Sequence, residues 1–106
     1  MPDEYVVVLS TLPPDKEPVR IGRTLVEERL AACVNVLPVM TSIYRWSEGI
    51  EEDPEHQVII KTTRARLPGL RERLQALHPY DVPEFIVLPI VDGSDAYLKW
   101  IGEAVT

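Results

Sequence analysis

The sequence predicts an α+β fold in the ferredoxin-like order βαββαβ, extended by a long β-hairpin and by a C-terminal helix. Short apolar runs alternate with segments of helical periodicity in this order along the chain. The layout places the first and third strands in the centre of the sheet. Both strand prolines, Pro38 and Pro89, fall in the strands expected at its edges, where a residue without an N–H is tolerated. The sequence has no linker and no repeat, so we expect residues 1–106 to form a single domain.

The chain opens with a strand followed by a helix. Tyr5–Leu9 is a valine-rich apolar run that is too short for a helix, which predicts a central strand. The prolines that follow it end the strand, and the next segment predicts a helix over Lys16–Ala32. Arg29 falls inside the apolar half of that helix. Its side chain either lies along apolar surface with its charge in water or forms an ion pair at a subunit boundary.

The middle of the chain predicts a hairpin that is longer than one small sheet needs. A second strand starts at Cys33–Leu37, is interrupted by a proline, and resumes at Thr41–Trp46. A turn at residues 47–49 returns the chain, and His56–Thr63 predicts the third strand. We expect the excess length of the hairpin to reach another subunit, because exposed strand edges are normally paired or covered.

A second helix, a fourth strand and a third helix complete the chain. Leucines at helical spacing predict a helix over Leu67–Leu77, which Pro79 ends. Phe85–Val91 predicts the fourth strand. Ser94 is suited to cap a short last helix.

Charge and composition exclude some classes of function. The net charge of −6 lacks the basic footprint of a nucleic-acid-binding protein. The N-terminal segment fits neither a signal peptide nor a membrane span, so we expect no membrane association. Cys33 is the only cysteine, which is typical of a reducing compartment and favours the cytoplasm.

Several short motifs together resemble the CutA family of divalent-cation tolerance proteins. They follow the family order over nearly the whole chain: Val26–Asn35, Thr41–Trp46, Lys61–Thr63, His78–Tyr80 with Val82–Glu84, and Tyr97–Trp100. The resemblance implies a ferredoxin-like fold assembled as a homotrimer through edge-strand pairing. It also implies a role in tolerance of divalent cations, copper especially.

The resemblance also directs attention to possible metal ligands. Family members proposed to bind copper use a Cys near the end of the first strand and a His at or just before the His-Pro motif. In this sequence the corresponding positions carry Ser10 and Leu77, and His78 is the matching ligand that remains. Imidazole suits copper and zinc, so we predict His78 as a ligand with Glu84 as its helper. The alternative for His78 is an interaction with the last carbonyl groups of the preceding helix.

The hairpin carries candidate interface residues. Tyr44, Arg45 and Trp46 alternate along an extended arm, and such aromatic residues are enriched at subunit contacts. A nucleic-acid stacking surface also uses aromatic rings, but it needs surrounding positive charge that this sequence lacks. We therefore predict that Tyr44, Arg45, Trp46 and Arg29 contact another subunit. The acidic run beside the hairpin turn is interpreted as a solvated tip.

Three classes of function remain open from the sequence. The first is a CutA-like cytoplasmic trimer that responds to divalent cations and binds Cu²⁺ or another such cation directly. The second is a PII-like signalling or scaffold trimer that binds a small molecule or a partner protein in clefts between subunits. The third is a small enzyme, which we do not favour because no motif for a catalytic triad, phosphate loop or dinucleotide site is present.

Overall fold

The computed structural model describes residues 4–106, which form an antiparallel sheet with helices packed against it. The elements in chain order are β1 (Tyr5–Leu12), α1 (Glu17–Glu27), β2 (Cys33–Trp46), β3 (Gly49–Thr63), a 3-10 turn (Arg64–Arg66), α2 (Leu67–Leu77), β4 (Ile86–Pro89) and α3 (Asp95–Ala104). The βαββαβ order with an added C-terminal helix confirms the fold class expected from the sequence.

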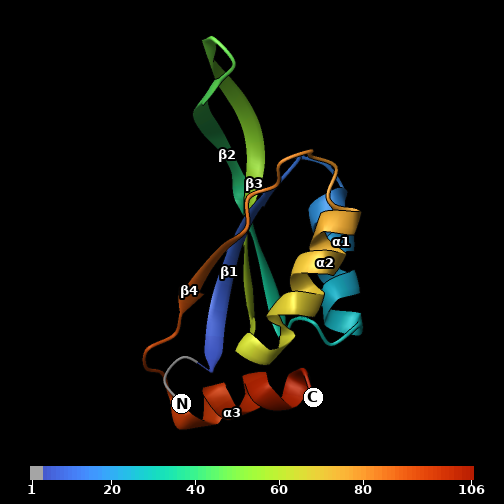
Figure 1. Ribbon diagram of the computed structural model, residues 1–106, viewed down its shortest axis with the longest axis vertical. Helices are drawn as coiled ribbons and strands as arrows, with labels where there is room; N and C mark the ends of the chain where they lie inside the picture. Colours follow the sequence, from blue (N-terminus) through green and yellow to red (C-terminus); the bar gives the residue numbers. More distant parts are fainter. Residues whose placement is uncertain (1–3) are drawn as a thin grey trace.

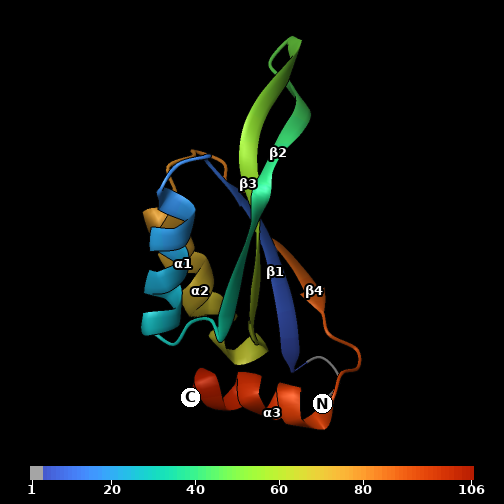
Figure 2. The same cartoon turned by 180° about the vertical axis from the view of Figure 1, so that it is seen from behind.

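The strand order in the sheet is β2-β3-β1-β4, and every neighbouring pair is antiparallel. The first and third strands are therefore central and the proline-bearing strands lie at the two edges, as predicted. Figures 1 and 2 show α1 and α2 side by side on one face of the sheet, with α3 crossing its lower end. The opposite face of the sheet carries no helix of this chain among residues 4–106.

The hydrophobic core lies between the sheet and α1 and α2. Side chains of β1 alternate, so that Val6, Val8 and Leu12 are buried toward the helices while Val7 and Leu9 on the other face are only partly buried. The remaining buried apolar side chains of this core are Ile21, Leu25, Ala31, Val58, Ile60, Leu67, Leu70 and Leu74. Each fully buried large side chain contributes about 1.5–3 kcal/mol, and this burial holds the helices on the sheet.

The hairpin of β2 and β3 extends well beyond the sheet, and the molecule measures 45 Å along its longest axis (Figure 1). Its two arms stay paired from Val39 opposite His56 to Trp46 opposite Gly49. Between Val36 and Val39 the register shifts, because β2 contains one residue more than β3 over this stretch. The shift is the bulge that Pro38 predicts.

The predicted end of the first helix, at Ala32, is wrong. The helix α1 stops at Glu27, and Arg29 has a φ of 60°, in the left-handed region that ends helical runs. The backbone N–H of Leu30 donates to the carbonyl of Leu25 at 3.0 Å, and the N–H of Ala32 already donates to Lys61 of β3 at 2.8 Å. Pairing with the sheet therefore overrides a helical pattern that the side chains alone would continue.

The boundaries of three strands also differ from the sequence prediction. The first strand runs on to Leu12, the third begins at Gly49, and the fourth is limited to Ile86–Pro89. The two longer strands gain residues because each finds a paired neighbour along its whole length. The short fourth strand pairs with β1 over four residues only.

Candidate functional site

A concavity at the base of the hairpin is the candidate ligand site, and we call it the hairpin cleft. It is formed where the arms of β2 and β3 leave the sheet and face the loop that connects α2 to β4. Its volume is about 810 Å³. The lining residues are Thr11, Pro14, Tyr44, Trp46, Asp53, Pro54, Glu55, Pro79, Tyr80, Asp81, Val82, Pro83 and Glu84.

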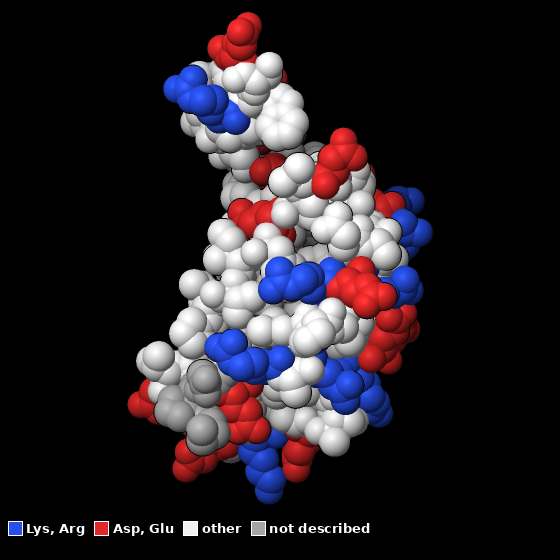
Figure 3. Space-filling model, in the orientation of Figure 1, with Lys and Arg blue, Asp and Glu red and all other residues white. Residues whose placement is uncertain are grey.

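The hairpin cleft has a negative electrostatic character. Four of its lining residues are acidic, namely Asp53, Glu55, Asp81 and Glu84, and none of the described residues lining it is Lys or Arg. Figure 3 shows acidic side chains at the neck between the hairpin and the body, while the basic side chains on this face gather mainly over the body below. A concave surface lined by charge of one sign raises the local concentration of oppositely charged ligands, so this cleft attracts cations.

Two tyrosines are hydrogen-bonded to carboxylates of the cleft. The hydroxyl of Tyr44 donates to Oδ2 of Asp53, and the hydroxyl of Tyr80 donates to Oε2 of Glu55 at 2.9 Å. The bond to Asp53 raises the pKa of Tyr44 to about 12. Burial and the bond to Glu55 raise the pKa of Tyr80 above its usual value. Both phenols therefore stay protonated at neutral pH and act as donors, not as bases or nucleophiles.

An aromatic wall lies along the hairpin side of the cleft. The rings of Tyr44 and Trp46 meet edge to face, with centroids 6.5 Å apart and planes inclined by 74°. Trp46 is 61% exposed, which is unusual for a residue of this size. The strand pairing fixes the backbone of both residues, so that their side chains are in place to contact a ligand or another subunit.

His78 anchors the loop side of the cleft to the sheet. The imidazole is only 7% exposed, and its Nε2 lies 2.8 Å from the carbonyl oxygen of Thr11 on β1. The backbone N–H of Tyr80 donates to its Nδ1 at 3.1 Å, and the rings of His78 and Tyr80 lie 4.8 Å apart. This pattern requires the neutral tautomer with hydrogen on Nε2. Burial lowers the pKa of His78, which keeps the ring neutral.

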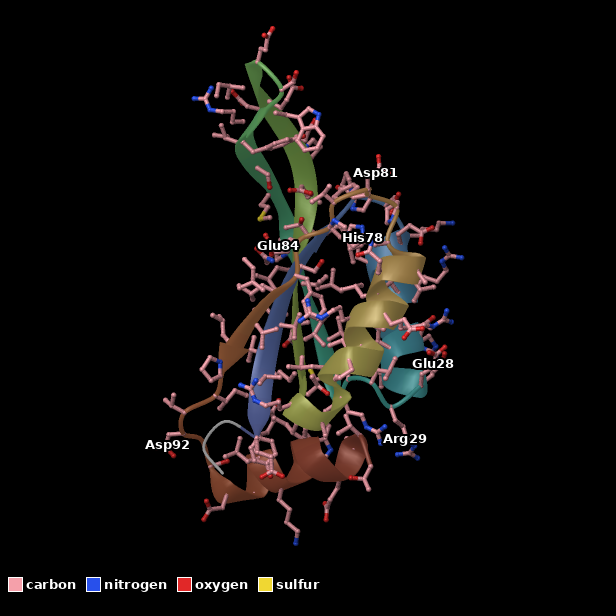
Figure 4. The ribbon with its side chains drawn as sticks, viewed as in Figure 1. Glu28, Arg29, His78, Asp81, Glu84 and Asp92 are labelled. Atoms are coloured by element: carbon pink, nitrogen blue, oxygen red, sulfur yellow. The ribbon has the colours of Figure 1, made fainter. Side chains whose placement is uncertain are left out.

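The predicted metal ligands do not form a metal site in this arrangement. Both ring nitrogens of His78 are engaged, so neither offers a free lone pair to a metal ion. Figure 4 shows His78 at the end of α2 and Glu84 beside the sheet, at opposite ends of the connecting loop. Glu84 accepts a hydrogen bond from Gln57 at 2.9 Å. Within residues 4–106, no group of three His, Cys, Asp or Glu side chains is placed to hold a metal ion. The residues present therefore do not fit a preformed copper centre.

The other residues singled out in the sequence lie apart from the cleft. Ser10 is completely buried on the helix-facing side of β1, and its hydroxyl has no hydrogen-bond partner among the described residues. Cys33 is partly buried at the start of β2. Arg29 contacts its own chain, where Nη1 lies 3.5 Å from the carbonyl oxygen of Ala104. Arg45 is exposed on the hairpin arm, opposite Ile50.

Sequence reasoning did not identify Asp53, Glu55 and Tyr80 as parts of one site. The two acidic residues belong to the run interpreted as a solvated hairpin tip. Tyr80 belongs to the motif in which only the histidine, His78, was predicted to have a role. A signal was available for the acidic pair, since Asp53 and Glu55 lie two residues apart on a strand and so share a face. Their partners on the loop follow only from the fold.

Comparisons with known proteins converge on one family. A family model described as CutA1 divalent ion tolerance protein matches residues 6–104. A relative from Thermus thermophilus named "Divalent-cation tolerance protein CutA" is 52% identical over 97 residues, which are 92% of this chain and 94% of the relative. A Xenopus laevis relative named "Protein CutA homolog" is 48% identical over 95 residues, or 90% of this chain, but the chain spans only 63% of its length.

Solved structures agree with this result. A Thermus thermophilus structure described as a divalent cation tolerance protein (Cut A1) superposes with a TM-score of 0.92 at 49% identity, covering 96% of this chain and 99% of that one. In the part of the chain that the structure describes, no helix is both long and apolar enough to cross a membrane.

Proposed function

Since this chain belongs to the CutA1 divalent ion tolerance protein family, we propose that it acts in the tolerance of divalent cations as a binding protein and not as an enzyme. The observation that carries the proposal is the hairpin cleft, a concave acidic surface built by the hairpin and the loop after α2. Four carboxylates give the cleft the negative charge that attracts cations. The single partly buried cysteine supports a cytoplasmic location.

The proposal includes assembly into a homotrimer. Both outer strands of the sheet leave backbone groups for pairing with another chain, and β4 exposes Ile86 and Leu88. The helix-free face of the sheet carries the partly buried side chains of Val7 and Leu9. The exposed apolar side chains on the other face of the hairpin, Ile43 and Ile50, support the prediction that the arm contacts a neighbouring subunit. Closed cyclic assembly covers these surfaces without leaving an edge open to further growth.

Light scattering at micromolar protein concentration tests the assembly. We expect three times the mass of one chain. A monomer mass would refute the trimer and, with it, the interface roles proposed for Tyr44, Arg45, Trp46 and Arg29.

Direct copper binding by His78 and Glu84 remains a prediction to be tested separately. Binding at His78 requires the imidazole to give up a hydrogen bond to Tyr80 or to Thr11, which costs about 1 kcal/mol or more and lowers the affinity. Copper titration of the wild type, His78→Ala and Cys33→Ser at neutral pH decides the question. Equal affinity in the wild type and His78→Ala excludes His78 as a ligand, and a selective loss in Cys33→Ser assigns the metal to the thiol.

A PII-like role, in which the cleft binds a small molecule and the cation response is indirect, is the second candidate. The occupied ring nitrogens of His78 favour it, and so does the volume of about 810 Å³, which far exceeds that of a metal ion. Absence of copper binding in every variant, together with a saturable thermal shift by a small molecule, would support this second candidate over the first.

A further inference from the structure

The chemistry of the hairpin cleft narrows the kind of molecule that it can hold. We infer that the cleft binds an organic ammonium ion that carries an apolar body, an inference that rests on the proposed role of the cleft as the binding site. The inference depends on three properties of the cleft: the sign of its charge, the aromatic and proline-rich character of its walls, and the way its carboxylates are already hydrogen-bonded.

The charge of the cleft selects a cation. Carboxylates approach from both sides, with Asp53 and Glu55 on the hairpin arm and Asp81 and Glu84 on the facing loop. The lining contains no basic side chain among the residues described, so an anionic ligand would find no partner for its charge. A cationic group placed between the arm and the loop would face carboxylates from two directions.

The walls of the cleft select a ligand with an apolar body. Trp46 and Tyr44 present aromatic rings, and an ammonium ion over such a ring gains about 0.5–2 kcal/mol from the interaction with the π system. Prolines line both sides, with Pro54 on the arm and Pro79 and Pro83 on the loop. These rigid apolar surfaces offer van der Waals contact that a hydrated metal ion cannot use.

The existing hydrogen bonds argue against a bare metal ion as the occupant. Oxygens of Asp53 and Glu55 already accept from the phenols of Tyr44 and Tyr80, and Glu84 accepts from Gln57. A metal ion would need several of these oxygens to converge within bonding distance, and no such group of three exists in residues 4–106. An organic ammonium ion needs only their negative field, which the hydrogen bonds from the phenols leave in place.

Fluorescence titration with benzyltrimethylammonium chloride tests the inference. The chain has two tryptophans, so the substitution Trp100→Phe on α3 leaves Trp46 as the single reporter in the cleft. We expect a saturable change of the Trp46 emission that weakens as salt is added, because the charge interactions are partly exposed. Benzyl alcohol and sodium benzoate serve as the neutral and anionic probes, and magnesium chloride and copper chloride as the metal probes.

Two substitutions form a matched pair for the charge. Asp81→Asn removes a carboxylate of the cleft, whereas Asp92→Asn makes the same change on the loop before α3, far from the cleft in Figure 4. Because partly exposed charge pairs contribute about 0.2–1 kcal/mol, we expect Asp81→Asn to raise the Kd of the ammonium probe about two- to fivefold. Asp92→Asn should leave the Kd unchanged. Trp46→Leu, followed by calorimetry, should raise the Kd about tenfold.

The outcomes separate this inference from the proposed function. Saturable binding of the ammonium probe with these variant effects supports the inference. Equal binding of benzyl alcohol or benzoate, equal effects of Asp81→Asn and Asp92→Asn, or binding of the metal ions alone would overturn it. If no organic probe binds while the protein is trimeric and binds copper, the inference fails and the proposed function stands. A monomer mass defeats the proposed trimer whatever the probes show.

Discussion

His78 is expected to stabilise the folded chain, whether or not it also acts as a metal ligand. Replacing it by alanine removes the hydrogen bond from Nε2 to the carbonyl of Thr11 and the bond from the backbone N–H of Tyr80 to Nδ1. Each such bond contributes about 1 kcal/mol net, and a partner left unsatisfied in a buried place adds about 1–3 kcal/mol. We therefore expect His78→Ala to lower the free energy of unfolding by about 2–4 kcal/mol per chain.

Thermal unfolding at one fixed protein concentration measures the effect, since assembly makes the midpoint depend on concentration. For a chain of this size, about 2–4 kcal/mol corresponds to a fall in Tm of about 10–20 °C. His78→Asn should cost about half as much, because an asparagine oxygen can still accept from the N–H two residues on but cannot reach β1. Gln75→Ala, on the exposed side of α2, serves as the neutral control. A change below about 0.5 kcal/mol in His78→Ala would refute the anchoring role.

The pH dependence of stability provides a second measure of the same residue. Burial lowers the pKa of His78 in the folded chain, so the folded state holds the ring neutral while the unfolded state takes up a proton below about pH 6.5. The stabilising contribution is therefore complete above about pH 6.5 and is lost as the pH falls toward the lowered pKa. We expect the wild type to lose stability more steeply than His78→Asn between about pH 6.5 and 5. Parallel curves would show that His78 titrates normally.

Four further substitutions test other features of the fold. Gly22→Ala should lower the free energy of unfolding by about 1 kcal/mol or more, because the added Cβ would lie 3.0 Å from Val34. Gly102→Ala, on the more open α3, should raise the free energy of unfolding by about 0.5–1 kcal/mol. Equal shifts in Tm would contradict this difference. Ser10→Ala should raise the free energy of unfolding by about 1 kcal/mol, since the buried hydroxyl has no partner among the described residues, and a clear loss in urea unfolding would disprove that. In an ultraviolet pH titration, Tyr44→Phe should remove the phenol ionisation near pH 12. Loss of an ionisation near pH 10 instead would count against the hydrogen bond from Tyr44 to Asp53.

Most of the fold could be predicted from the sequence because its signals are local. The valine-rich run of β1, the leucine spacing of α2, and Pro38 and Pro89 at the edges each act through neighbouring residues. The end of α1 could not be predicted, since it depends on a hydrogen bond between Ala32 and Lys61 that exists only once the sheet has formed. The helical pattern of side chains continues past this point, and it carries no information about a hydrogen bond to another strand.

The site was less accessible to sequence reasoning. The motif drew attention to His78, but the role of its ring depends on a carbonyl of Thr11, which lies 67 residues earlier in the chain. Glu55 and Tyr80 are likewise 25 residues apart. The alternation of Tyr44 and Trp46 correctly indicated an extended arm, because a period of two is a property of the strand itself. The contact of this arm with another subunit stays a prediction. Contacts between distant segments account for what the sequence left open.

The bulge before Val39 determines which side chains of β2 face the cleft. Opposite residues of a paired ladder share a face, and the register after the bulge places Tyr44 opposite Glu51 and Arg45 opposite Ile50. If the pairing of Val36 with Val58 continued without the bulge, Tyr44 would lie opposite Ile50 and Arg45 opposite Gly49, so that Arg45 rather than Tyr44 would share the face of Asp53. The extra residue in β2 thus places an aromatic side chain, and not a basic one, on the face that lines the cleft. The ligand preference inferred for the cleft therefore depends on a single-residue irregularity in the pairing of β2 with β3.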